Sequence, residues 1–230
     1  MLRLVGFFLL VLVALHLLRL IPFVGPIFDV PILGFWGAAI LISLAASRWA
    51  TFALDRRRAS VRVRELGHVD TPHNQGKLGT LYVGARRYRA AIAPLERAVQ
   101  GEPDVAEWRY RLGCALLGAR RPRDAVAALE AGAAIDEEHA YGALLMRLSQ
   151  ARLAVRDAQG ALEALDRRDR NHGPDPESAY RRGLALKALG RRPESRASFA
   201  EAATLARTSA GFRRGQARKW AALATLARLS

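Results

Sequence analysis

The stretch GARRYRAAIAPLERAV (residues 84–99) decides the fold, because the chain writes nearly the same stretch again. It returns 34 residues later as GARRPRDAVAALEAGA (118–133), and near the end as LGRRPESRASFAEAAT (189–204). Each copy places apolar residues at the three- and four-residue spacing of one helix face, after a short arginine-rich segment. A repeat of this length predicts a unit that stacks on its own copies to bury a shared core.

Small and large apolar residues keep the same period along the chain. Small residues recur at spacings of 34, 36 and 34, at Gly79, Gly113, Ser149 and Gly183. The same spacings relate a second small set (Ala91, Ala125, Ala161 and Ser195) and a large apolar set (Leu95, Leu129, Leu165 and Phe199). Two helical patterns in each period predict a helix-turn-helix unit. We expect the glycine of the first helix to face the alanine of the second, so that the two backbones pack closely.

The first unit resembles the tetratricopeptide repeat family. The large, small, aromatic and proline positions of that family's pattern are occupied by Leu78, Gly79, Tyr82, Tyr88, Ala91, Leu95, Ala98 and Pro103. The resemblance covers residues 72–209 and implies an all-α solenoid of about four repeats, at 72–105, 106–141, 142–175 and 176–209. The later units depart from the pattern, because Glu137 replaces a proline and three arginines replace apolar or small residues (Arg152, Arg168 and Arg182).

The last segment, residues 210–230, is predicted to be a further helix. Trp220, Leu223 and Ala224 fall on one face of that helix, and basic residues fall mainly on the other. We expect it to cap the array by covering the last exposed apolar face. A basic amphipathic helix that lies on a membrane surface is the alternative interpretation.

The first 54 residues differ in composition from the rest of the chain. Two apolar segments, Leu4–Leu18 and Ile32–Ser47, flank a proline-rich stretch, and they predict a membrane anchor of two transmembrane helices. A cleaved signal peptide is the alternative, although the residues that follow the first segment are bulky. Arginines crowd the basic linker at 55–71, which predicts that both termini are cytoplasmic. These features predict an integral membrane protein of the bacterial inner membrane type, with a cytoplasmic repeat domain.

The chain is strongly basic, with 36 Lys and Arg residues against 21 acidic residues and a formal net charge of +15. This charge attracts anionic partners in general, but an arginine-rich genome composition would explain it equally well. Cys114 is the single cysteine, which excludes an intramolecular disulfide and a thiolate metal cluster.

The sequence shows little that indicates catalysis. His68, Asp70 and His73 could hold a metal ion, but helix capping or a linker explains these residues more simply. No nucleophile motif, phosphate-binding loop or paired carboxylates accompany them. We therefore expect a protein that is not an enzyme, with no cofactor and no bound metal.

The family resemblance implies that the first helices line a concave groove that binds a protein or peptide partner. The groove positions would be Tyr110, Cys114, Leu117, Met146, Gln150, Tyr180, Leu184 and Lys187. Gly76 and Thr80 stand where chaperone-binding members have lysine and asparagine, which argues against a clamp for a chaperone carboxylate. Tyr110, Met146 and Tyr180 indicate an apolar groove for an amphipathic helix or an extended peptide. Alternatively, these residues only complete the helix packing.

Charged residues also follow the repeat. A basic row would flank the groove at Lys77, Arg111, Arg147 and Arg181. Arginines cluster in the turns within units, at Arg86, Arg87, Arg120, Arg121, Arg156, Arg191 and Arg192. Acidic residues cluster in the turns between units, at Glu102, Asp104, Asp136, Glu137, Glu138, Asp175 and Glu177. These patterns predict a basic edge and an acidic edge, either solvated or used for docking anionic protein or lipid.

The leading functional hypothesis is a membrane-anchored scaffold that gathers a protein partner of unknown identity. The alternative is a basic surface that binds RNA, the ribosome or anionic lipid. The aromatic residues lie at core spacing rather than as a stacking platform, which disfavours nucleic acid. Nothing in the sequence indicates a small-molecule substrate.

Overall fold

The computed structural model describes residues 40, 42–51, 70–211 and 214–229. The chain divides into two units, Met1–Arg62 and Val63–Ser230. Residues 42–51 of the first unit are helical. All the other described residues except Ile40 belong to the second unit, and the fold and the candidate site are built from them.

No helix among the described residues combines the length and the apolar character needed to cross a bilayer. This finding contradicts the predicted localisation as an integral membrane protein with a cytoplasmic repeat domain. The first predicted span, Leu4–Leu18, lies outside the described residues, as does the second before Ile40.

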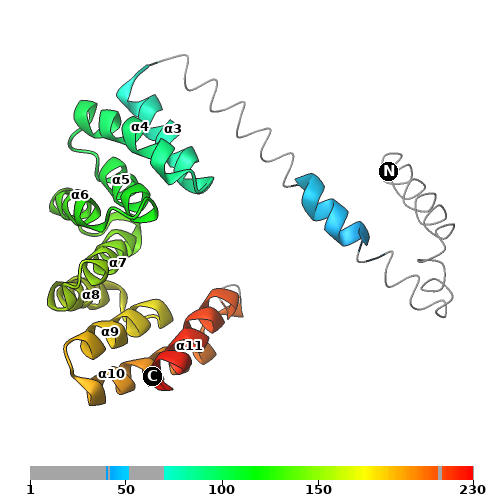
Figure 1. The fold of residues 1–230 in the computed structure, drawn as a ribbon, viewed down its shortest axis with the longest axis vertical. Helices are drawn as coiled ribbons and strands as arrows, with labels where there is room; N and C mark the ends of the chain where they lie inside the picture. The colour runs from blue at the N-terminus through cyan, green and yellow to red at the C-terminus, as the bar shows by residue number, and fades with distance from the viewer. Residues whose placement is uncertain (1–39, 41, 52–69, 212–213, 230) are drawn as a thin grey trace, which may run out of the picture. The chain divides into compact units, whose positions relative to one another are not determined.

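The second unit consists of helices in succession (Figure 1). They are α3 (Pro72–Gly84), α4 (Tyr88–Gly101), α5 (Ala106–Gly118), α6 (Pro122–Ile135), α7 (His139–Ala154), α8 (Ala158–His172), α9 (Pro176–Ala188), α10 (Arg192–Thr208) and α11 (Arg214–Leu229). The helices pack in antiparallel pairs, α3 with α4, α5 with α6, α7 with α8 and α9 with α10. This arrangement confirms the predicted all-α solenoid of tetratricopeptide-like helix pairs. We call the four pairs units 1 to 4.

The units stack through their first helices. Helix α3 contacts α5, α5 contacts α7 and α7 contacts α9, so that α3, α5, α7 and α9 form one continuous face. Each second helix also contacts the first helix of the next unit. Helix α11 contacts both α9 and α10, which is the place that a next first helix would take.

Glycine on the first helices of units 1, 2 and 4 allows close packing, but the residue that it faces differs from the prediction. A Cβ atom added at Gly79 would lie 2.3 Å from Cγ of Leu95, and one at Gly113 would lie 2.4 Å from Cγ of Leu129. The glycine therefore lies against the large residue of the second helix rather than against its alanine. Ala91 is fully buried, as is Leu95. Unit 3 has Ser149 in place of glycine, and its hydroxyl donates a hydrogen bond to the Met146 carbonyl at 2.8 Å.

The turns within units share one backbone conformation. In unit 1, the Arg86 amide donates to the Val83 carbonyl at 3.0 Å and the Arg87 amide donates to the Tyr82 carbonyl at 2.8 Å. A residue with positive φ makes this closure possible. It is an arginine in the first three units and a glycine in the fourth: Arg86, Arg120, Arg156 and Gly190.

The spacing of 36 residues between units 2 and 3 has a local explanation. Ala140, Tyr141 and Gly142 all have positive φ (53°, 57° and 73°), so the chain turns sharply before the regular part of α7 begins. The two additional residues are absorbed in this turn. The ring of Tyr141 extends into solvent and is 87% exposed.

The three arginines that depart from the repeat pattern lie in ion pairs and hydrogen bonds. Arg152 donates to the Gly160 carbonyl at 2.9 Å and to Glu130 at 2.7 Å. Arg168 donates to Asp169 at 2.6 Å and also binds Asp175. Their apolar stems replace the expected small or apolar side chains, and their charges are compensated at the interfaces between helices.

Arg182 completes the network between units 3 and 4. It donates to Asp166 and to Asp169, at 2.9 Å each. Burial raises the pKa of Asp169, and the hydrogen bond from Arg168 opposes this rise. Glu137, the other departure, accepts a hydrogen bond from Arg167 at 2.8 Å.

Candidate protein-binding face

The candidate site is the face formed by α3, α5, α7 and α9. The predicted groove residues lie on α5, α7 and α9, but they differ in exposure. Tyr110 and Met146 are only 9% and 7% exposed, so they belong to the core rather than to the surface. The predicted apolar strip of half-exposed anchors is therefore not present at these two positions.

Tyr110 is held between helices. Its ring lies 5.5 Å from the ring of His139, and the guanidinium of Arg111 lies 5.2 Å from the Tyr110 ring centroid. Burial raises the pKa of Tyr110, nearby Cys114 raises it further, and the charge of Arg147 opposes the rise. The residue fixes α5 against its neighbours.

Tyr180 packs beneath the last helix. Its ring lies 6.0 Å from that of Phe199 and 5.5 Å from that of Trp220 on α11. The guanidinium of Arg181 lies 5.4 Å from the centroid of the Trp220 ring. Tyr180, which the sequence analysis placed in the groove for a partner, thus packs against the capping helix α11.

Other predicted groove residues remain accessible. Cys114, Leu117, Gln150 and Leu184 are partly exposed, and Lys187 is exposed. Burial raises the pKa of the Cys114 thiol, although the neighbouring Arg147 guanidinium opposes this rise. These side chains are the accessible members of the predicted groove on α5, α7 and α9.

Two of the four members of the predicted basic row are compensated by acidic residues. Arg111 pairs with Glu107 at 2.6 Å, and Arg181 pairs with Glu177 at 2.7 Å. Both pairs join residues four positions apart on one helix. Lys77 on α3 is exposed.

Hydrogen bonds through Gln150 of α7 connect two members of the basic row, Arg147 and Arg181. Gln150 accepts from Arg147 at 2.8 Å and from Arg181 at 3.3 Å, so its amide oxygen joins α7 to α9. Glu107 also reaches His139, with 2.6 Å between carboxylate oxygen and Nε2. The face is thus a polar network with apolar residues between its members, rather than a basic track.

Sequence reasoning missed the roles of Glu107, Glu177 and His139, and it did not predict which residues Trp220 would contact. The two glutamates were visible as partners, because each precedes an arginine of the row by four residues. The contacts of His139 and Trp220 join different helices, so no local spacing indicates them.

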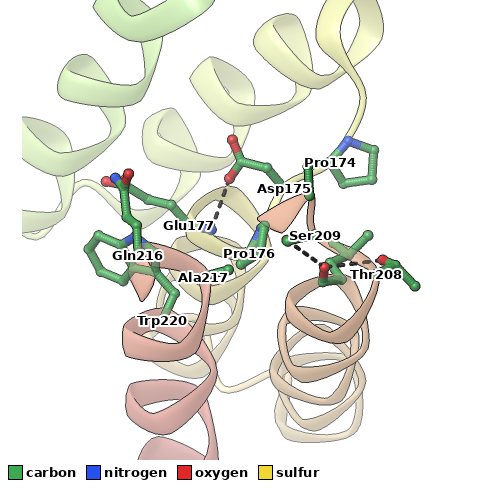
Figure 2. Close-up of a pocket in the computed structure, with 11 residues that line it drawn as sticks. Pro174, Asp175, Pro176, Glu177, Thr208, Ser209, Gln216, Ala217 and Trp220 are labelled. Atoms are coloured by element: carbon green, nitrogen blue, oxygen red, sulfur yellow. Dashed lines mark hydrogen bonds between the residues drawn. The ribbon is translucent and has the colours of Figure 1, made fainter. Parts of the chain in front are cut away.

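A pocket of about 530 Å³ lies at the end of the array, between the start of α9, the end of α10 and the start of α11 (Figure 2). Its carboxylates are already engaged, since Asp175 accepts hydrogen bonds from the α9 backbone and Glu177 pairs with Arg181. The indole nitrogen of Trp220 is buried and has no hydrogen-bond partner in the described part of the chain.

The suggested metal ligands are not assembled as a site. Asp70 accepts a hydrogen bond from Gln75 at 2.6 Å, and His73 lies 3.7 Å from Glu102. His68 lies outside the described residues. Within the residues that the structure describes, no group of three or more histidine, cysteine or acidic residues could hold a metal ion.

Comparison with known proteins supports the repeat assignment. A model of the tetratricopeptide repeat family matches residues 82–148. No curated protein sequence matched the chain. The tetratricopeptide repeat family is thus supported by a family model over part of the array.

Solved structures show the same fold. A crystal structure of MamA protein shares 18% identity, covers 76% of this chain and 87% of its own, and has a TM-score of 0.54. MamA from residue 41 onward, from Desulfovibrio magneticus RS-1, shares 15% identity, covers 69% and 94%, and has a TM-score of 0.53. A thermophilic TPR protein of Thermus thermophilus shares 16% identity, covers 77% and 94%, and has a TM-score of 0.56. At these identities the likeness establishes the fold alone.

Proposed function

We propose that this protein is an interaction scaffold that binds a segment of a protein partner along the face of α3, α5, α7 and α9. The observation that carries this proposal is the continuous contact of these helices, which presents equivalent positions of successive units side by side. The tetratricopeptide-like fold supports it, because solenoids of this kind offer extended surfaces for binding.

The exposed chemistry of the face favours an amphipathic segment. Leu117 and Leu184 offer partly exposed apolar surface, and Gln150 is partly exposed as well. The Gln150 oxygen already accepts from Arg147 and Arg181, so its amide nitrogen is the group to donate to a partner. The charges of Arg111 and Arg181 there are compensated by ion pairs with Glu107 and Glu177. A partner would therefore bind through apolar contacts and hydrogen bonds more than through charge attraction.

Site-specific photo-crosslinking tests the proposal. A photoreactive residue at Leu117 or Leu184 should crosslink a discrete partner in cells of the source organism. The same residue at Ala127, which is exposed on the second helix α6, is the matched control and should not. The proposal fails if Ala127 gives the same products as Leu117 and Leu184.

Leu117→Glu with Leu184→Glu should then remove the crosslinked partner while the helical circular dichroism signal is retained. Substituting Tyr110 and Tyr180 would be a poor test. Both residues support the packing, so their loss would unfold the array as well as alter the face.

A further inference from the structure

Arginine occupies an unfavourable backbone position in three successive turns. Arg86, Arg120 and Arg156 have φ of 59°, 64° and 65°, and only the fourth turn has the relaxed residue, Gly190 at 76°. Residues with a Cβ atom are strained in this region, whereas glycine is not. Glycine is not scarce in the chain, which contains 19. A glycine in place of Arg86, Arg120 or Arg156 would relieve this strain, as Gly190 does in the fourth turn.

The turns of units 1 and 2 enclose a hollow of about 430 Å³. Four arginines line it, at Arg86, Arg87, Arg89 and Arg120, together with Tyr88, and no carboxylate is among the lining residues. The turns lie directly on each other, since a Cβ atom added at Gly118 would be 2.3 Å from the Tyr88 ring. We call this the arginine hollow.

The charges of the arginine hollow are uncompensated. Arg86, Arg89 and Arg120 are exposed and form no ion pair within the described residues, and Arg87 lies 5.1 Å from the Tyr82 ring centroid. In contrast, Arg121 just outside the hollow pairs with Asp124 at 2.6 Å. Four unpaired guanidinium groups in one concave place attract a compact anion.

The acidic edge of a second copy is a poor candidate for that anion. Six of its seven carboxylates already have partners within the described part of the chain. Glu102 accepts from the Trp108 indole, Glu137 from Arg167 and Glu138 from Asn171. Asp136 lies 3.6 Å from His139, Glu177 pairs with Arg181, and Asp175 binds Arg168. Only Asp104 remains, exposed and without such a partner, and its single charge would not compensate the arginines of the hollow.

The corresponding hollow between units 3 and 4 is balanced. Arg156 and Asp157 line it together. Asp157 also caps α8, because its side chain accepts from the Gly160 amide at 2.9 Å. In the arginine hollow, Arg87 stands at the N-cap of α4 and provides no such hydrogen bond. A hollow lined by arginines without a carboxylate is thus found between units 1 and 2 but not between units 3 and 4.

We propose that the arginine hollow binds the phosphoryl group of a phosphorylated protein segment. A phosphorylated side chain carries nearly two negative charges and three acceptor oxygens, and the planar arginine fork matches such oxygens with paired hydrogen bonds. A single carboxylate brings one charge, as does each phosphate of a nucleic acid strand. The balanced hollow of units 3 and 4 would also interrupt a long strand. This site lies in the turns, apart from the first-helix face, and does not depend on the proposed function of that face.

Fluorescence polarisation with the full chain tests this inference. The probe is a labelled Gly-Gly-phosphoserine-Gly-Gly peptide, compared with the same peptide containing glutamate, with inorganic phosphate and with a ten-nucleotide RNA. We expect the phosphopeptide to bind at least tenfold more tightly than the glutamate peptide. R86G with R120G should weaken this binding at least tenfold, although the melting temperature should stay equal or rise because glycine relieves the backbone strain.

The matched control is R156G. It relieves the same strain in the balanced hollow, so it should keep phosphopeptide binding and raise stability in the same way. The proposal is overturned if R86G with R120G binds the phosphopeptide as well as the native chain does. It is also overturned if the glutamate peptide or inorganic phosphate binds as tightly as the phosphopeptide. Tighter binding of the RNA that R156G also weakens would instead assign the whole turn edge to nucleic acid.

Discussion

A single arginine can both pack its apolar stem between helices and form ion pairs with its guanidinium. This is the case for Arg152, Arg168 and Arg182. Each stands where the repeat normally has an apolar or small side chain, and each has carboxylate partners from other turns or helices. Burying a guanidinium without such partners would be strongly destabilising. Arg86 and Arg120 differ, because no carboxylate compensates them. The neighbours of an arginine, rather than its repeat position, thus decide its role.

Ala91 tests the packing at residue scale. The side chain is fully buried on α4, so Ala91→Leu should overpack the crossing of α3 and α4. We expect a loss of about 1–3 kcal/mol in the free energy of unfolding, measured with urea. Ala93→Leu on the exposed face of the same helix is the control and should change little. Equal stability of both variants would contradict the packing described here.

The Cys114 thiol gives a prediction that depends on pH. Its pKa is raised, chiefly by burial, so the folded chain holds the proton more tightly than the unfolded chain does. Alkylation by iodoacetamide at pH 8 should therefore be roughly tenfold or more slower than in guanidinium chloride. The same sign means that stability declines as pH rises above the pKa of the unfolded thiol. Equal alkylation rates in the two conditions would show that the thiol is not perturbed.

At the scale of elements, α11 takes the position of a further first helix. Its Trp220 lies against Tyr180 and Arg181 of α9, and its Ala224 is fully buried. A solenoid needs such a terminal element, because its last unit otherwise exposes the apolar face that the next unit would cover.

Trp220→Ala tests this role of α11. The substitution removes a large ring from the contact with α9, so we expect a loss of about 2–3 kcal/mol in the free energy of unfolding. Leu226→Ala lies on the same helix at a side chain that is 66% exposed, and it should be nearly neutral. A neutral Trp220→Ala would mean that α11 does not stabilise the array.

At the scale of the molecule, the repeat period was sufficient to predict the fold. Gly79, Gly113 and Gly183 mark the same packing position in their units, and helix pairs follow from local periodicity. Contacts between neighbouring units are close in sequence, so the architecture depends on few long-range pairings.

The candidate site was harder to predict. Family positions located Tyr110, Met146 and Tyr180 on the correct helices, but Tyr110 and Met146 are buried in the core and Tyr180 is covered by the capping helix. Exposure depends on contacts between helices, which periodicity does not encode. The strained turns could not be predicted for another reason. A positive φ is usually indicated by glycine, but at Arg86 the residue is an arginine in an arginine-rich sequence.

The sharp turn at Ala140, Tyr141 and Gly142 has an evolutionary consequence. There the array accepts two additional residues while Leu144, Leu145 and Leu148 just beyond the turn remain fully or almost fully buried. These leucines belong to the same buried cluster as Leu116 and Leu129 of unit 2, so units 2 and 3 share one core across the turn. Insertions and deletions can therefore accumulate at this turn, whereas a recombination that replaced units 3 and 4 would have to keep the leucines that complete the shared core.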